Sequence, residues 1–268
     1  MGLRQLSQGH RMLSRRLPSL VFTAAMAAVC VSSPTRAEAP NCGAVSDSRS
    51  NVFIKLLMTP PCDVCEETKA ELKELNEIQD ARTPGDVDHA KADITISLQR
   101  FLDGADIKFD AAALDKCGPF FDKLSKLTKE AGNNAKNTFC RTRPYKLSGS
   151  TLQPLQSVDH LKNSPSYPSG HTTYGTLIGT VLAQMLPEKR DQLYTRIADY
   201  GHSRMIVGVH YRSDVDAGKI LGAAIAADEF ANDEEFKAAF PRATACVRGA
   251  VGLRNQTSPA QEATVHHP

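Results

Sequence analysis

The stretch Ser166-Tyr-Pro-Ser-Gly-His-Thr172, which leads directly into an apolar run that ends at Leu186, decides the fold around it. The apolar run is long enough for a helix, and a proline follows it. The N-terminus of that helix presents backbone N–H groups at Ser169-Gly170-His171, where anions bind well. Gly170 lets the backbone approach an oxygen closely, Ser169 adds a hydroxyl donor, and His171 is a candidate acid. Alone, such a segment is an ordinary capped turn, so the flanking sequence has to carry the interpretation.

Two cations precede this stretch. Lys136 and Arg143 are seven residues apart, so they lie on one face if a helix runs to about Thr142. Pro144 disfavours a helical conformation at Arg143 and is expected to end the helix there. At a helix end, Arg143 can bind two phosphate oxygens, while Lys136 supplies a point charge.

A third segment follows the apolar helix. Ser203 and Arg204 are expected near the end of another helix, and Gly208 provides the break that turns His210 toward the same pocket as Arg204. Asp214 lies four residues beyond His210, within reach of one imidazole nitrogen. A hydrogen bond there leaves the other nitrogen unprotonated and nucleophilic. The sequence therefore predicts a phosphate site with a nucleophile, an acid and three cations.

The periodicity of the remaining chain is helical, and strands are nearly absent. The expected helices cover residues 66–79, 87–102, 120–129, 172–186, 188–207, 214–230 and 234–246. The small residues of 215–227 allow close helix approach and suggest a buried central helix there. With 268 residues, of which 41% are hydrophobic, the chain is expected to form one compact all-α domain.

Residues 1–39 have the features of a secretory signal peptide: arginines without acids, then an apolar core, then small residues before the end. Ordinary Sec export is favoured, and the pair Arg15-Arg16 leaves twin-arginine export as the alternative. Without residues 1–37 the chain has 27 basic and 30 acidic residues, a net charge of −3. We therefore expect a domain over residues 40–248, a flexible tail over 249–268, no nucleic-acid partner and no stable membrane association once the leader is removed.

Six cysteines lie beyond the leader: Cys42, Cys62, Cys65, Cys117, Cys140 and Cys246. An even number in an exported chain favours structural disulfides over a redox or zinc site. The pairing stays open at this point.

Together the three segments resemble the type 2 phosphatidic acid phosphatase superfamily, whose pattern is Lys-x6-Arg-Pro, Pro-Ser-Gly-His and Ser-Arg-x5-His-x3-Asp. Every fixed letter is matched in this chain. The run 166–172 also resembles the signature of bacterial class A non-specific acid phosphatases, with Pro165 where that signature usually has Gly. The resemblance implies an exported all-α phosphatase with a fold as in class A acid phosphatases and vanadium haloperoxidases.

The resemblance and the residue types imply the same reaction. His210 would attack phosphorus to form a phosphohistidine, Asp214 would orient it, and His171 would act as general acid and then base. Lys136, Arg143, Ser169, Gly170 and Arg204 would hold the phosphate oxygens. The expected enzyme is a periplasmic acid phosphatase that acts on small phosphate monoesters at mildly acidic pH, without a metal or cofactor, and its oligomeric state is left open. The alternatives are a vanadate-dependent haloperoxidase and a phosphate-binding protein without activity.

Overall fold

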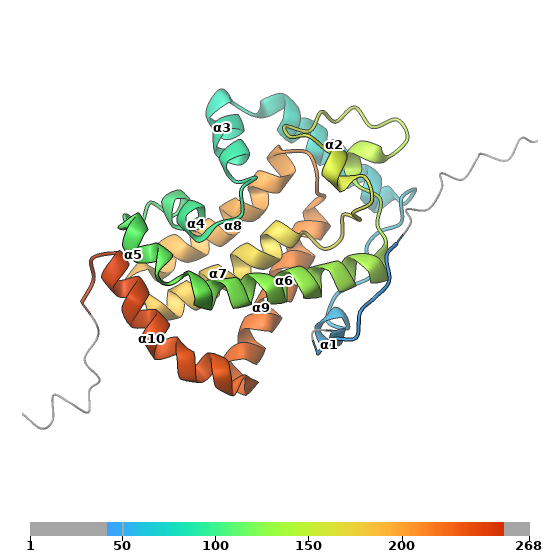
Figure 1. Cartoon of the computed structure of the whole chain (residues 1–268). Coiled ribbons are helices and arrows are strands. Elements are labelled where there is room, and N and C mark those ends of the chain that lie inside the picture. Colours follow the sequence, from blue (N-terminus) through green and yellow to red (C-terminus); the bar gives the residue numbers. More distant parts are fainter. Residues whose placement is uncertain (1–41, 50, 255–268) are drawn as a thin grey trace, which may run out of the picture. The chain divides into compact units, whose positions relative to one another are not determined.

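The computed structural model describes residues 42–49 and 51–254, and all of them fall within one compact unit. The expected signal peptide and most of the expected C-terminal tail lie outside the described residues. Within these residues every regular element is a helix, which confirms the all-α fold class (Figure 1). The α-helices are α1 (Asn51–Ile54), α2 (Glu66–Ala81), α3 (Pro84–Ala92), α4 (Leu98–Gly104), α5 (Ala111–Asp115), α6 (Gly118–Phe139), α7 (Gly170–Met185), α8 (Arg190–Ile206), α9 (Arg212–Asn232) and α10 (Glu234–Ala250). Short 3₁₀ helices cover Pro144–Lys146, Asp159–Leu161 and Pro187–Lys189.

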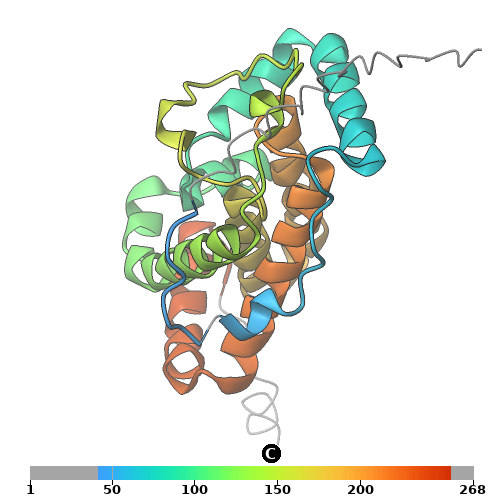
Figure 2. The same ribbon diagram turned by 90° about the vertical axis from the view of Figure 1, so that its right-hand side faces the viewer.

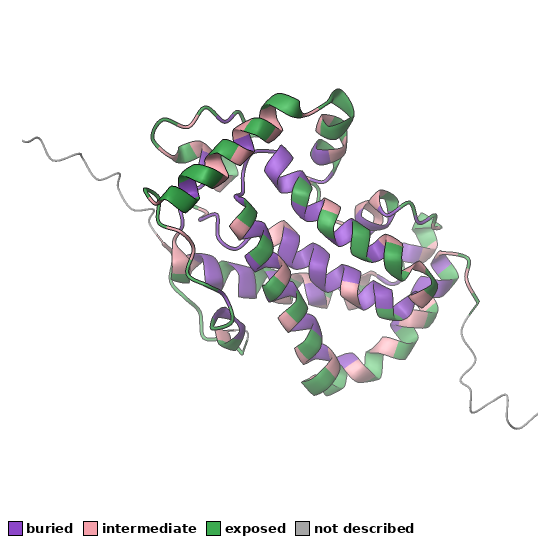
Figure 3. Cartoon of the chain, turned by 180° about the vertical axis from the view of Figure 1, so that it is seen from behind, coloured by how far each residue is buried: buried purple, intermediate pink, exposed green. Residues whose placement is uncertain are grey.

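Helix α7 forms the centre of the fold. It is buried on nearly all sides and packs against α6, α8 and α9 (Figures 1 and 3). A helix without a polar face has to be covered by other helices, and this one begins at the motif residue Gly170. The first turn of the central helix is therefore held rigidly by the core.

The small residues of α9 allow the close approach that the sequence predicts. A Cβ added at Gly222 would lie 2.5 Å from the carbonyl oxygen of Thr173 in α7, and one at Gly218 would lie 2.7 Å from that of Ser169. The expectation that α9 itself is the buried central helix is wrong, because Ile220 on its outer face is 44% exposed. The small residues of α9 allow it to pack closely against α7, and α7 is the central helix.

Two helix expectations need correction. The predicted helix 87–102 is two helices, because Ser97 accepts a hydrogen bond from the N–H of Arg100 and so starts α4 anew. Helix α6 ends at Phe139, and its cap Cys140 has φ +56°, the left-handed conformation that terminates helices. The chain leaves α6 before Arg143, which is extended (ψ 149°) as a residue before proline must be.

The cysteines form three disulfides: Cys42–Cys140, Cys62–Cys65 and Cys117–Cys246. This confirms the preference for structural bridges over a zinc site. Two of them join parts of the chain that are 98 and 129 residues apart, and one fixes the residue that ends α6.

Helices α2 and α3 pack against α8 (Figures 1 and 2). Helix α2 carries Glu71 to the start of α9, where it meets Arg141. Helix α10 packs against α5 and α9 and runs to Ala250, two residues past the boundary expected at 248. None of the helices in the described part of the chain has the length and apolar character needed to cross a membrane.

Candidate active site

The three motif segments meet at a cavity of about 170 Å³. Its walls include six of the predicted site residues, namely Lys136, Arg143, Gly170, His171, Arg204 and His210. Further walls come from Ile94, Gln156, His160, Leu161 and Ser164. These six residues come from the end of α6 and the segment after it, from the start of α7, and from the end of α8 and the segment after it. The packing of these helices around α7 therefore forms the site.

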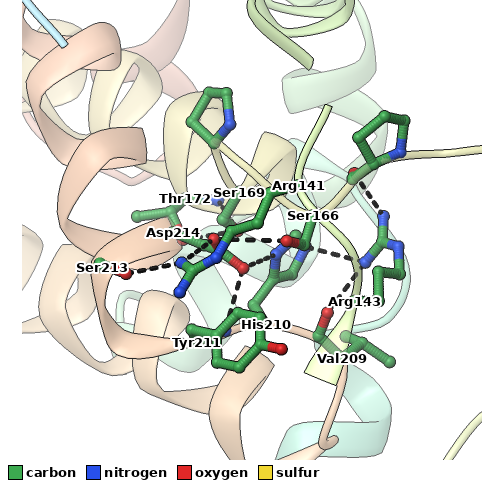
Figure 4. Close-up of polar contacts among 12 residues, drawn as sticks. Arg141, Arg143, Ser166, Ser169, Thr172, Val209, His210, Tyr211, Ser213 and Asp214 are labelled. Carbon is green, nitrogen blue, oxygen red and sulfur yellow. Dashed lines mark hydrogen bonds and ion pairs between the residues drawn. The ribbon is translucent and has the colours of Figure 1, made fainter. Parts of the chain in front are cut away.

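His210 and Asp214 form the expected pair at the start of α9 (Figure 4). The imidazole Nδ1 of His210 donates to Oδ2 of Asp214 at 3.2 Å, and the same oxygen accepts from the backbone N–H of Tyr211 at 3.0 Å. The other imidazole nitrogen, Nε2, lies 3.3 Å from Nη1 of Arg143 and is therefore the acceptor. Burial lowers the pKa of His210 well below its ordinary value, and Arg143 and Lys136 lower it further. The Nε2 lone pair of His210 is thus kept unprotonated beside Arg143 in the cavity wall.

Arg143 is fixed by the loop around it. Its Nε donates to the carbonyl of Ser164 at 2.8 Å. Its Nη1 donates to the carbonyl of Val209 at 2.9 Å (Figure 4). These bonds orient the guanidinium plane beside His210. Burial lowers the pKa of Arg143 from its ordinary value, yet an arginine remains charged at neutral pH.

Arg204 has donors to spare. Its Nη2 donates to Oε1 of Gln156 at 3.1 Å, while the buried Nε and Nη1 have no hydrogen-bond partner in the described part of the protein. Burial lowers the pKa of Arg204 to about 10, so it carries its charge at neutral pH. A buried, charged arginine with two unmet donors is costly in the free protein, and an anion would satisfy it.

Lys136 lies in the cavity wall but is committed to the motif loop. Its ammonium donates to the carbonyls of Pro165, Ser166 and Pro168 at 2.8, 3.2 and 2.7 Å. An ammonium has three hydrogens, so all are used. Burial and the charge of Arg143 lower the pKa of Lys136 well below its ordinary value, but three bonds donated to carbonyls require the protonated ammonium. Lys136 therefore shapes the loop and adds positive potential rather than a free donor.

Ser169 and Gly170 begin α7. The hydroxyl of Ser169 accepts from the backbone N–H of Thr172 at 3.4 Å and from its hydroxyl at 2.9 Å. Ser169 is thus the N-cap and is fully buried behind the cavity wall, whereas Gly170 lines it. The contributions of Ser169 and Gly170 to anion binding stay predictions.

His171 faces the cavity from the first turn of α7. Its Nε2 donates to the carbonyl of Ile94 at 3.0 Å, which leaves Nδ1 for acid–base chemistry. Burial lowers the pKa of His171 well below its ordinary value, and the charge of Arg204 lowers it further. The direction of this pKa shift favours the neutral form of His171 in the free protein.

Sequence reasoning missed Arg141. Its Nη1 donates to Oδ1 of Asp214 at 2.8 Å, and the residue is 3% exposed (Figure 4). The expected helix to Thr142 would have pointed positions 141 and 143 in different directions. In the extended segment after Cys140, alternate residues share a face, so a second arginine two positions before Arg143 was the available signal.

Ser203 belongs to a separate buried cluster. Its hydroxyl donates to Asp93 at 2.6 Å, and Asp93 also binds Arg196. Asp93, His89 and Asp199 are close enough to share a metal ion, but Nη1 of Arg196 lies 3.0 Å from Asp93 and 3.1 Å from His89. The guanidinium takes the central position that a cation would need, so the cluster is a structural ion-pair network.

Residues 124–231 match the family model of the PAP2 superfamily, a span that includes every motif residue. A non-specific acid phosphatase of Salmonella typhimurium is 42% identical over 123 residues, 46% of this chain and 47% of that protein. One of Providencia stuartii is 34% identical over 125 residues, 45% of this chain and 50% of that protein. Among solved structures, a transmembrane PAP2-type phosphatidylglycerolphosphate phosphatase of Bacillus subtilis has a TM-score of 0.43 and 18% identity, over 69% of this chain and 94% of that one.

The chain thus spans about half the length of the curated relatives it matches. The family match confirms the resemblance that the motifs indicate, and the haloperoxidase alternative gains no support from these comparisons.

Proposed function

We propose that this chain, similar over residues 124–231 to the PAP2 superfamily, is an acid phosphatase that hydrolyses small phosphate monoesters. The observation that carries the proposal is that a nucleophilic lone pair, on His210, and hydrogen-bond donors without a partner among the described residues, on Arg204, line the same cavity. His210 Nε2 is held unprotonated beside Arg143, and two buried donors of Arg204 await an acceptor. A phosphoryl group uses both features, since its oxygens satisfy the donors and its phosphorus accepts the lone pair.

In the first step His210 Nε2 attacks phosphorus in line with the ester oxygen. The N–P bond forms, the P–O bond to the leaving group breaks, and His171 gives that oxygen a proton. The positive charge that develops on the imidazole is stabilised by Asp214 through the Nδ1 hydrogen bond.

In the second step water attacks the phosphohistidine. His171 takes the proton from the water, the N–P bond breaks, and inorganic phosphate leaves. Arg143, Arg204 and the N–H of Gly170 bind the equatorial oxygens in both steps, while Lys136 contributes its charge. Positioning and charge stabilisation of this kind supply most of the rate enhancement in phosphoryl transfer.

Acidic pH enters through substrate binding. His171 is neutral in the free protein, but a phosphate dianion placed against it would raise its pKa and let it take a proton. We therefore expect the enzyme–substrate complex, rather than the free enzyme, to carry the protonated acid.

The cellular setting follows from the leader and the charge. We propose export to the periplasm by the segment 1–39 and a substrate class of small phosphorylated molecules, with neither nucleic acid nor membrane lipid as partner. The chemistry assigned to the chain's own residues uses no metal, so a chelator should leave the turnover unchanged.

The test is release of phosphate from an aryl phosphate by the purified chain. His210→Ala should abolish the reaction. His202→Ala, an exposed histidine of α8 that does not line the cavity, should keep it. Rapid quench into an alkaline denaturant during turnover should show phosphate attached to His210, because a phosphohistidine survives base but is hydrolysed in acid. More of it should accumulate in His171→Ala, where the second step lacks its base. Full activity in His210→Ala would refute the mechanism.

A further inference from the structure

Asp214 is held on both of its oxygens. Oδ2 accepts from His210 and from the N–H of Tyr211, whereas Oδ1 accepts from Arg141 at 2.8 Å (Figure 4). The His210 contact needs a particular orientation of the carboxylate plane. Arg141 makes the shortest contact on the opposite oxygen, so it sets that orientation.

Arg141 is itself fixed from three sides. Its Nη1 also donates to the hydroxyl of Ser213 at 2.7 Å, and Nη2 donates to Oε2 of Glu71 in α2 at 2.7 Å. The guanidinium carbon lies 3.9 Å from the centre of the Tyr211 ring. These contacts hold the Arg141 guanidinium in one position. Its hydrogen bond to Oδ1 then fixes the orientation of the Asp214 carboxylate.

Glu71 completes the arrangement. Its second oxygen accepts from the backbone N–H of Ser213 at 2.6 Å, in the first turn of α9. One carboxylate of α2 thus caps α9 and fixes the arginine that orients the carboxylate of Asp214. None of Glu71, Arg141 and Asp214 lines the cavity, so the chain of contacts acts from behind the reacting groups.

Arg141 also balances charge. Asp214 is fully buried, and burial raises its pKa, while Arg141 and the N–H of Tyr211 oppose that rise. Burial disfavours the charge on Arg141 too, but Asp214 and Glu71 raise its pKa overall. The charged and titratable groups around Asp214 are Arg141 and Arg143 after α6, Lys136 in α6, Tyr167 before α7, His210 and Tyr211 before α9, and, through Arg141, Glu71 in α2.

We propose that Arg141, oriented by Glu71, is a positioning residue of the proposed phosphatase that keeps Asp214 ionised and aligned with His210. The inference rests on the proposed function. A purely structural role, which would only tie α2 to α9, is the competing explanation. The surface pair Arg212–Glu74 joins the same two helices without touching Asp214 and provides the matched control.

The experiment compares wild type, Arg141→Gln, Glu71→Gln and Arg212→Gln in the full chain, with kcat and KM measured from pH 4 to 8. In Arg141→Gln the buried carboxylate loses its countercharge, so kcat should fall about tenfold or more and the acidic limb of the kcat profile should move to higher pH. KM should stay within about twofold, because Arg141 does not line the cavity. Arg212→Gln should match wild type throughout.

Glu71→Gln separates orientation from charge. It keeps an oxygen for Ser213 but presents an amide to Arg141, so kcat should fall while the acidic limb does not move upward. This variant also carries the test if Arg141→Gln does not fold: unchanged kcat in Glu71→Gln would overturn the proposal. An unshifted acidic limb in folded Arg141→Gln, or the same loss in Arg212→Gln, would overturn it as well. Absence of phosphate release by wild type would instead refute the proposed function.

Discussion

At the scale of single residues, the arginines of the site differ in how many of their hydrogen-bond donors have protein acceptors. Arg143 and the terminal nitrogens of Arg141 are bound to protein acceptors, and Arg141 leaves one buried donor, Nε, without a partner in the described part of the chain. Arg204 leaves two, Nε and Nη1. Lys136 is a motif residue, yet all its hydrogen-bond donors bind carbonyls of the loop before α7. The residue that binds an anion most directly is therefore the one that the free protein leaves least satisfied.

Whether a buried arginine has its donors bound predicts how its substitution changes stability, and Arg204 and Arg248 should behave in opposite ways. Arg204→Met removes a buried charge with unmet donors, each of which costs about 1–3 kcal/mol, so the free energy of unfolding in phosphate-free buffer should stay equal or rise. Phosphatase activity should fall by about a hundredfold or more, because an oxyanion contact is lost. Urea unfolding and phosphate-release assays measure both quantities.

Arg248 provides the matched control for that prediction. It is also buried, but its donors are bound by Glu188 and by the carbonyls of Met185 and Arg254. Arg248→Met should therefore lower the free energy of unfolding and leave kcat/KM unchanged. Equal destabilisation by the two substitutions would contradict the assignment of Arg204 as an unsatisfied anion ligand.

At the scale of elements, the site depends on how closely α9 approaches α7. Gly222 has no room for a side chain, since a Cβ would meet the Thr173 carbonyl oxygen at 2.5 Å and the Thr176 Cβ at 2.8 Å. Both contacts lie in the helix that begins with the motif. Spacing between the two helices thus sets the distance between their first turns, where His171 and Asp214 lie.

Gly222→Ala should consequently destabilise the protein by about 1–3 kcal/mol through overpacking, although alanine favours a helix by about 1 kcal/mol over glycine. Gly132→Ala in α6 is the control, because a Cβ there meets nothing within 4 Å. It should be neutral or slightly stabilising. Thermal unfolding of both variants decides the matter, and a stable Gly222→Ala protein would show that α7 and α9 are not in tight contact.

At the scale of the whole molecule, the fold buries two neutral histidines. The pKa of His171 and that of His210 both lie well below the ordinary value of 6.5, mainly because of burial. The unfolded chain binds protons at both positions as the pH falls through 6.5, whereas the folded chain does not. Stability then falls as the pH falls, because the unfolded state binds more protons.

The free energy of unfolding should therefore decrease from pH 7 to about pH 5.5, with a slope approaching 1.4 kcal/mol per pH unit for each histidine. His171→Asn should reduce that slope, and the exposed-site variant His202→Asn should not. Urea titrations in phosphate-free buffer at several pH values provide the measurement. A stability that is independent of pH in this range would mean that the two histidines have the same pKa in the folded and unfolded states.

Local signals explain the features that could be predicted from the sequence. Helix α7, the cap at Ser169, the break at Gly208 with φ +81° and the His210–Asp214 hydrogen bond all depend on residues within a few positions of one another. Short-range sterics and capping act at that distance, so residue spacing predicted them. The same spacing selected six residues that line one cavity.

The remaining features depend on contacts between distant parts of the chain. The end of α6 at Cys140 is decided by that residue's left-handed conformation and its bridge to Cys42, and the role of Lys136 depends on where the loop carbonyls lie. Arg141 meets Asp214 and Glu71 across about 70 residues in either direction. Contacts at such separations arise from packing of whole helices. The spacing of Arg141 and Arg143 could mark a shared face, but it could not identify Asp214 and Glu71 as the partners of Arg141.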